Sequence, residues 1–457
     1  MSLQVLAMGQ NPPAQDQGND PSRSTPAPAL TGVIGIDSPM QEEDSSSTLP
    51  AIPALLGGPK LSVALRSESE RSNYLRGGIN VGSTYDDNAL LTPHNTVGNT
   101  AVSVFPNISL EQARSRVKWS LGYAGGFTVN QRIADQASQD VKFDSQFRLS
   151  PHVTLRVAEE VSYTSGFFDS GNSSGVGIGN GGPNPSLLLP ANKQLSNSTV
   201  AEVDYHFALK DVIGASGSYS SLHFRDVPAG AQLIDTQTAS GSAFWLHGLF
   251  GRDWAGVAYH FQRVTFDPNG ETLVHSFMVV NTITLPNRFT LSGFIGPEYS
   301  KNRGLTPTGG GTASDFNDWS VAGGIEAGWQ KDHTSVAAGY SRQISDGGGI
   351  LGAVRLQGIH GAVRQQLLPG WAVSVGASYG RNESLTVPLV GTASKINTAS
   401  LGASLERNLG KSLGVRVGYN HDFQEQVGAT DPSLQGTSHR NRFFVTVGYQ
   451  WSRPLGR

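Results

Sequence analysis

From about residue 73 to the C-terminus, apolar residues occupy every second position of one segment after another. The segments 117–129, 199–208, 399–406 and 443–451 each combine one apolar face with one face of small or charged residues. Alternation with a period of two is typical of β-strands, whose successive side chains point to opposite faces. The segments are about 12 to 16 residues long, whereas strands of globular sheets have a mode of about 5 to 6 residues.

The connections between these segments alternate between tight turns and longer polar loops. Gly, Pro, Asp and Asn predict tight turns near residues 112, 150, 210, 252, 286, 331, 369 and 408. Longer loops are predicted at 87–100, 131–137, 167–194, 228–236, 303–316, 385–393 and 426–437, with short ones near 268–270 and 346–349. This alternation of turns and loops predicts about eighteen strands, with about sixteen as the alternative count.

Long antiparallel strands with one apolar face and one polar face are what a transmembrane β-barrel requires. Backbone groups in hydrocarbon must all be paired, so the sheet has to close on itself. We therefore predict an all-β fold, a single antiparallel transmembrane β-barrel over residues 71–457. An even strand number places both termini on the tight-turn side, which is periplasmic in barrels of the bacterial outer membrane. A barrel of this size has a water-filled lumen unless a loop or the N-terminal segment plugs it.

Composition excludes several other classes of protein. Charged residues make up 15% of the chain and hydrophobic residues 37%, and no apolar run approaches the roughly 20 residues of a membrane-spanning helix. The net charge of -3 provides no basic footprint for nucleic acid. The absence of cysteine excludes disulfides and thiolate metal sites, and we expect no cofactor.

The N-terminal segment, residues 1–70, differs from the rest of the chain. It is rich in Pro, Ser, Gln and acidic residues, so it buries too little apolar surface to fold alone, and we predict disorder. Residues 1–9 contain "LQVLAMG", which is similar to the end of a signal peptide. An ordinary flexible terminus is the alternative interpretation.

The motif "GSTYDDNALLT", followed by "SVFPNISLEQARSRVKWSLGYAGGF", resembles the porin-like β-barrel families of the bacterial outer membrane. The residues that carry the resemblance are Tyr85, Asp86, Asp87, Asn88, Pro106, Tyr123 and Gly125. It covers the first three strands, and some members of these families are associated with exopolysaccharide export. Such barrels often end on an aromatic residue that the outer-membrane assembly machinery recognises, whereas here Ser452–Arg457 follow Trp451.

Alternation also assigns side chains to the two faces of the barrel. The pore-lining candidates are Lys118, Lys142, Asp144, Arg148, Arg156, Glu202, Asp204, His206, Glu326 and Arg355. Their mixed charges predict weak ion selectivity and suit polar solutes such as sugars. The membrane-interface candidates are Trp119, Trp329, Trp371, Tyr449 and Trp451 near the tight turns, with Tyr163, Tyr299, Tyr340 and Tyr379 toward the loops. Glu159 and Trp254 fall on the wrong faces, which predicts a β-bulge or a register shift.

Several local motifs imitate functional sites. Gly376–Gly380 spells a nucleophile elbow but lies inside a strand pattern, and Gly177–Gly182 spells GxGxxG but is followed by prolines instead of a helix. The eleven histidines show no metal-ligand spacing. Asp86–Asn88 offers oxygen ligands for a cation, although turn chemistry explains the same residues.

The sequence therefore favours a passive outer-membrane channel without enzymatic activity, in contact with lipid and open to small polar solutes or saccharides. The alternatives are a barrel for exopolysaccharide export, a plugged structural barrel, and a barrel hydrolase. The Gly-rich loop 167–194 is a candidate constriction loop, and a plain surface loop is the competing interpretation.

Overall fold

The computed structural model describes residues 73–166, 192–225, 233–249, 253–267, 270–285, 288–303, 316–331, 333–348, 351–385, 395–410, 412–428 and 436–455. These residues form eighteen strands. They are β1 (Tyr74–Asp86), β2 (Asn99–Ala113), β3 (Val117–Asn130), β4 (Gln136–Arg148), β5 (Val153–Gly166), β6 (Asn192–Ala208), β7 (Asp211–Arg225), β8 (Thr236–Gly248), β9 (Trp254–Phe266), β10 (Gly270–Leu285), β11 (Phe289–Arg303), β12 (Phe316–Lys331), β13 (Thr334–Gly347), β14 (Leu351–Leu368), β15 (Trp371–Ser384), β16 (Lys395–Leu409), β17 (Leu413–Val427) and β18 (Gly436–Pro454).

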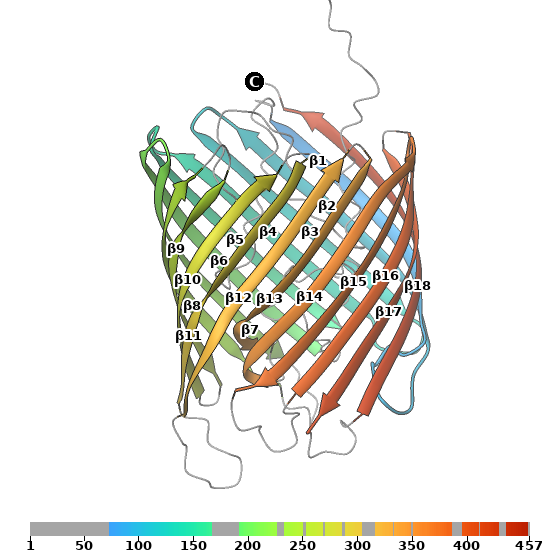
Figure 1. Cartoon of the computed structure of the whole chain (residues 1–457). Coiled ribbons are helices and arrows are strands. Elements are labelled where there is room, and N and C mark those ends of the chain that lie inside the picture. Colours follow the sequence, from blue (N-terminus) through green and yellow to red (C-terminus); the bar gives the residue numbers. More distant parts are fainter. Residues whose placement is uncertain are drawn as a thin grey trace, which may run out of the picture.

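The strands form one closed antiparallel barrel (Figure 1). Each strand pairs with its sequence neighbours, and β1 also pairs with β18 from Tyr74↔Pro454 to Asp86↔Arg442. The first described strand and the last one therefore close the barrel along their length, with the start of β1 and the end of β18 at the rim that carries the tight turns. The predicted all-β barrel and its eighteen strands are confirmed, and residues 1–70 lie outside the described part of the chain.

The barrel inverts the usual distribution of apolar and polar residues. Apolar side chains on the outer face are exposed, including Phe127 at 65% and Phe443 at 55%. Polar side chains on the inner face are buried, including Asn80 at 3% and Thr272 at 0%. The alternation of each strand produces this arrangement, because pairing in register keeps all residues of one phase on the same face.

Inward aromatic side chains lie flat against glycines of the neighbouring strand. Phe244 covers Gly214 and Phe444 covers Gly418, and neither glycine has room for a Cβ atom. Both pairs are direct cross-strand partners. A ring that lies along the wall buries apolar area without projecting into the lumen, so the glycines compensate for large residues on the inner face.

The expected bulge near Glu159 is wrong. Pairing of β5 with β4 and β6 is continuous, so Glu159 lies on the outer face beside Thr199. Trp254 does occupy the inner face, where it packs on a buried cluster that includes Phe244 and Met278. The misplaced phase of Trp254 therefore comes from apolar packing inside the barrel. Across the described residues, no helix is long and apolar enough to span a membrane.

Candidate functional site

A row of paired charges lies on the inner face of β4–β6. The Lys142 Nζ atom lies 3.0 Å from a Glu160 carboxylate oxygen and 3.5 Å from one of Asp140. Arg156 bridges the two carboxylates of β6, at 2.6 Å from Glu202 and 3.4 Å from Asp204. Alternating acids and bases on adjacent strands thus neutralise one another along this wall.

The other charged pore-lining candidates on regular strands share the same inner phase. Lys118 lies next to Trp119 on β3 and has the opposite phase, and Asp144 and Arg148 share the phase of Lys142 on β4. His206 and Glu326 lie on the inner phases of β6 and β12. Arg355 differs from these residues, because its strand leaves the regular wall.

A second charged sector covers β14–β18 and β1, and the sequence interpretation did not select it. Glu406 on β16 accepts hydrogen bonds from Arg364 at 3.3 Å and from Arg416 at 3.1 Å. The Arg416 and Glu406 side chains are only 4% and 7% exposed. The phase of these residues was visible in the sequence, but their pairing depends on the register between strands.

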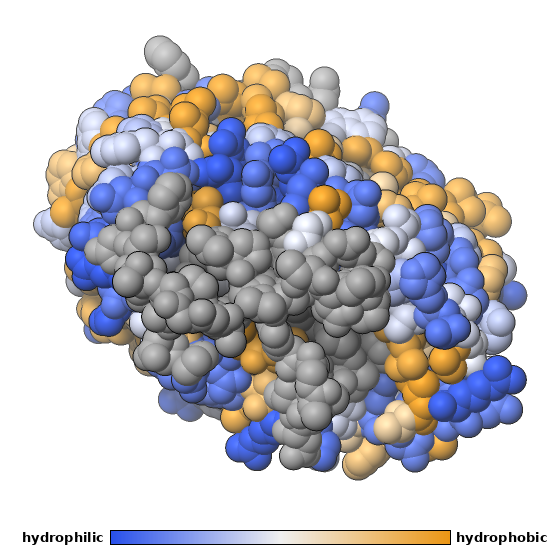
Figure 2. Space-filling view, turned by 90° about the horizontal axis from the view of Figure 1, so that it is seen from below, coloured by the Kyte–Doolittle hydropathy of each residue, from blue (hydrophilic) through white to orange (hydrophobic). Residues whose placement is uncertain are grey.

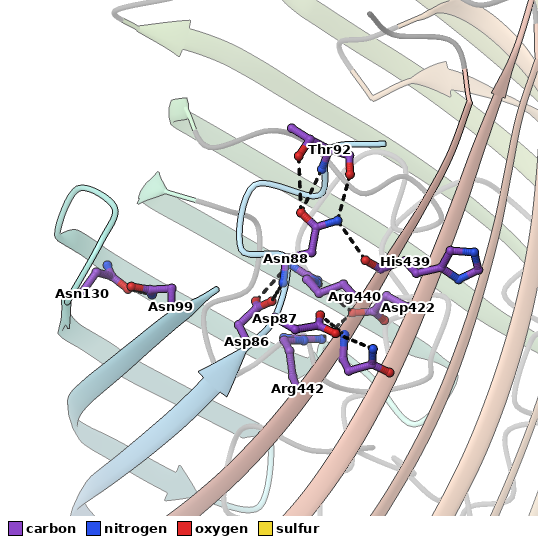
Figure 3. Close-up of polar contacts among 11 residues, drawn as sticks. Asp86, Asp87, Asn88, Thr92, Asn99, Asn130, Asp422, His439, Arg440 and Arg442 are labelled. Atoms are coloured by element: carbon purple, nitrogen blue, oxygen red, sulfur yellow. Dashed lines mark hydrogen bonds and ion pairs between the residues drawn. The ribbon is translucent and has the colours of Figure 1, made fainter. Parts of the chain in front are cut away.

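The closing seam of the barrel holds the densest part of this sector (Figure 3). The Oδ2 atom of Asp422 on β17 accepts hydrogen bonds from Arg440 and Arg442 on β18, each at 2.9 Å. Asp86, at the end of β1, lies 4.0 Å from Arg440. All three strands that meet at the seam therefore contribute to one buried charge network.

The motif residues Asp87 and Asn88, just after β1, form hydrogen bonds with β18 at the end of the closing seam. Both carboxylate oxygens of Asp87 accept hydrogen bonds from Asn441, at 2.7 and 2.6 Å. The Asn88 amide donates to the carbonyl oxygens of Thr92 and His439, each at 2.9 Å. The described residues contain no group of three or more ligating side chains suited to a metal ion. The oxygens proposed for a cation thus serve to join the first strand to the last.

One hairpin departs from the barrel wall. Pairing of β12 with β13 runs from Lys331↔Thr334 to Gly323↔Arg342 and ends there, although β12 stays paired with β11 up to Phe316. Beyond Arg342, β13 pairs only with β14. In Figure 1, β13 curves away from β12 toward the lower rim. We refer to residues 343–348 and 351–356 as the inner hairpin.

The inner hairpin packs against the inside of the nearby wall, which β9–β11 form. Ile344 is 4% exposed and donates its backbone N–H to Glu298 of β11 at 3.4 Å. Ala353 is fully buried in a cluster with Val264 and Phe266 of β9. These contacts involve side chains on the inner face of β9–β11, so the hairpin forms a second layer inside the barrel.

An ion pair marks the edge of this second layer. Arg355 of β14 contacts the Asp318 carboxylate of β12. By alternation, Arg355 shares the outer phase of Ile359, which is 55% exposed on the outer surface, whereas Asp318 shares the inner phase opposite to Trp319. An outer-phase residue meets an inner-phase residue only because the hairpin lies inside the wall.

The lumen therefore has two kinds of wall. Strands β4–β6 and β14–β1 present paired charges, whereas β8–β11 present buried apolar clusters beside buried polar residues such as Thr272 and Glu298, and the inner hairpin partly covers this wall. Viewed from the loop-bearing rim, hydrophobic residues line much of the upper margin and hydrophilic residues gather nearer the centre (Figure 2).

The outer face carries a half-buried polar arrangement at the position that the sequence pattern marked as anomalous. The Glu159 carboxylate accepts a hydrogen bond from the Asn197 amide at 2.7 Å and another from the Thr199 hydroxyl. The neighbouring strand β6 thus supplies two donors to a carboxylate that has no cation beside it among the described residues. The sequence placed Glu159 on the correct face, and hydrogen bonds to β6 accommodate its carboxylate there without the expected bulge.

The remaining sequence motifs carry no catalytic arrangement among the described residues. Ser378, the centre of the Gly376–Gly380 pattern, lies inside β15, and its hydroxyl is 3.0 Å from that of Ser400. Residues 167–191, which include the GxGxxG pattern and most of the candidate constriction loop, lie outside the described residues. The structure assigns a constricting position to the inner hairpin.

No family model matches the chain, and no curated protein matches it. Similar solved structures include the outer membrane protein OpdK from Pseudomonas aeruginosa, at 11% identity over 83% of this chain and 99% of that chain, with a TM-score of 0.42. Pseudomonas aeruginosa OccK2 (OpdF) in complex with glucuronate is 10% identical over 83% and 98%, with a TM-score of 0.43. The siderophore receptor PiuA from Acinetobacter baumannii is 8% identical over 84% and 82%, with a TM-score of 0.44. Because these TM-scores are below 0.5, we infer function from the residues of this chain.

Proposed function

We propose that this protein is a channel of the bacterial outer membrane that passes small polar solutes, including saccharides. The observation that carries the proposal is the inverted barrel: exposed apolar residues cover the outside, and paired charges and buried polar residues cover the inside. An apolar exterior suits lipid, and a closed sheet leaves no strand edge in hydrocarbon except beside the inner hairpin. Both termini of the barrel lie on the tight-turn side, which corresponds to the periplasm in this proposal.

The strand number supports an aqueous path. Eighteen strands spaced by about 4.8 Å and tilted by about 40° give a backbone diameter of about 35 Å. Side chains of both walls reduce this to a clear width of about 20 Å, part of which the inner hairpin occupies. A mono- or disaccharide fits through such a space with its hydration shell.

The charge pattern supports a weakly selective pore. Lys142, Arg156 and Asp422 each contact groups of opposite sign, so the walls are polar but locally neutral. Neutral polar solutes gain hydrogen-bonding partners on such walls without a strong field that repels either ion.

Reconstitution into planar bilayers and liposomes tests the proposal. We expect discrete conductance steps with a permeability ratio for K⁺ and Cl⁻ within about threefold of unity, and swelling of liposomes in glucose or maltose. Comparing the full chain with a variant that begins at residue 71 distinguishes an open barrel from one plugged by residues 1–70. The channel would be contradicted if the full chain and the shortened variant both fold into heat-modifiable barrels and both fail to give conductance or swelling.

A further inference from the structure

We propose that the inner hairpin is a gate that exchanges its place inside the lumen for a place in the barrel wall, where it pairs with β12. The inference rests on the proposed channel function, because it concerns what opens and narrows the lumen. The structure presents the inward arrangement, in which the hairpin lies against β9–β12. The outward arrangement follows from the register of the strands and the alternation of their side chains.

The first support is an open strand edge. In the described residues, β12 is paired on one side up to Phe316, but its pairing with β13 ends at Gly323. Residues 316–322 therefore present backbone N–H and C=O groups with no strand beside them on that side. Such edges are unfavourable near a membrane and favour the addition of a strand.

The second support is the register. Continuing from Gly323↔Arg342, the next pairs of β12 and β13 would be Ala322 with Gln343, Val321 with Ile344, and Ser320 with Ser345. In that arrangement Ile344 joins Val321 on the outer face, where Val321 is already 50% exposed. Gln343 and Ser345 then face the lumen. Residues 343–345 thus satisfy the apolar-out and polar-in rule of the wall in the outward position.

The third support is an alternative partner for Arg355. In the inward arrangement its guanidinium contacts Asp318 across the gap in the wall. Glu383 lies directly opposite Arg355 in the pairing of β14 with β15 and shares its face. When the hairpin joins the wall, Arg355 exchanges Asp318 for Glu383, so its charge has a carboxylate in both positions.

The fourth support is a weak contact near the base of the hairpin, where β13 leaves β12 after Arg342. The hydrogen bond from Ile344 to Glu298 is 3.4 Å long, which is beyond the usual range and easily broken.

Engineered disulfides test the two arrangements directly, since the chain has no cysteine of its own. The pair V264C/A353C links two members of the buried inner cluster and traps the inward hairpin. The pair V321C/I344C requires the outward register, because Val321 now points outside and Ile344 is buried inside. The pair S218C/S240C is the matched control, because these hydroxyls are 2.6 Å apart across β7 and β8 and remote from the hairpin.

Each variant is assembled in lipid vesicles, oxidised and mapped by mass spectrometry, and single-channel conductance is recorded before and after dithiothreitol. We expect all three disulfides to form. The hairpin cross-section, about 10 Å by 10 Å, is about one third of the clear lumen, so the V321C/I344C disulfide should conduct about one and a half times as much as the V264C/A353C disulfide. Reduction should bring the two to a common value, and the control should not change.

Failure of V321C/I344C to oxidise, when both other pairs do so in folded barrels, would overturn the gate. Equal conductance of the two hairpin disulfides would overturn it as well. If no variant conducts, the channel proposal fails, whereas the mapped disulfides still decide whether the hairpin reaches β12.

Discussion

Asp422 is the residue whose loss should most weaken the closing seam. Its side chain is 5% exposed and accepts hydrogen bonds from Arg440, which is 4% exposed, and from Arg442, which is 8% exposed. The Asp422→Ala change removes the carboxylate that two buried guanidinium groups share, while Asp86 stays 4.0 Å from Arg440. Removing one partner of a buried ion pair costs about 3–5 kcal/mol, because the remaining charge stays desolvated.

The free energy of unfolding in phospholipid vesicles, measured by urea titration with tryptophan fluorescence, checks this value. We expect Asp422→Ala to lose about 3–5 kcal/mol, and the triple change with Arg440→Met and Arg442→Met to recover most of the loss, because apolar residues replace the whole network. Glu383→Ala is the control, since its ion pair with Arg381 is 44% and 39% exposed and should contribute less than about 1 kcal/mol. A loss below about 1 kcal/mol for Asp422→Ala would refute the buried network as a source of stability.

Three further predictions concern the faces and the end of the barrel. Glu159→Gln keeps hydrogen-bonding atoms but removes a charge from the outer face, so the free energy of unfolding should rise by about 1 kcal/mol. A lower free energy of unfolding in the same urea titration would contradict a lipid-facing carboxylate. Gly418→Val should destabilise the barrel by about 2 kcal/mol, because the valine side chain collides with the ring of Phe444. Adding Phe444→Ala should recover part of that loss, whereas additive losses of the two changes would argue against the contact. Deleting Gly436–Pro454 should abolish the heat-modifiable band on gels, because β1 and β17 each lose the partner on one side. Deleting Ser452–Arg457 removes only the last pairs with β1 and should leave that band. A band of equal intensity after both deletions would contradict closure by β18.

The barrel itself could be predicted from the sequence because its cause is local. In β3, β6 and β18 the alternation assigns each residue to a face, and the tight turns set where each strand ends. Strand order then follows from the short connections, since neighbouring antiparallel strands need no crossover. Even the anomaly at Glu159 was placed on the correct face, and the bulge was wrong only because hydrogen-bond donors from β6 were not visible in the sequence of β5.

The closing seam could be predicted only in part. The motif Tyr85–Asn88 indicated a strand end with turn chemistry, which the structure contains. Its contacts with Asn441 and His439 depend on the pairing of β1 with β18, and those residues are more than 350 positions apart in the chain. A one-residue shift in that register would separate these pairs, so no local pattern identifies them.

The inner hairpin could not be predicted because its first residues continue the alternation of the strand before them. Gln343, Ile344 and Ser345 continue the pattern of β13, so the sequence gives no sign that pairing with β12 ends at Gly323. What the sequence does contain is a run of glycines at 347–349 and a mostly apolar strand start after it. Those features permit an inward turn, but the choice between positions depends on contacts with β9 and β11.

The balance between the two hairpin positions can be estimated from those contacts. Moving outward exposes Ile344, Val264 and Phe266, which are at most 5% exposed in the inward arrangement. Burial of such side chains is worth about 1.5–3 kcal/mol each, part of which Ile344 recovers in lipid. Pairing with the β12 edge adds about four backbone hydrogen bonds at about 0.5–1.5 kcal/mol each. The burial lost is about 3–9 kcal/mol and the hydrogen bonds gained are worth about 2–6 kcal/mol, so the two terms are of similar size. A gate of this kind rests inside the lumen and opens without unfolding any other part of the barrel.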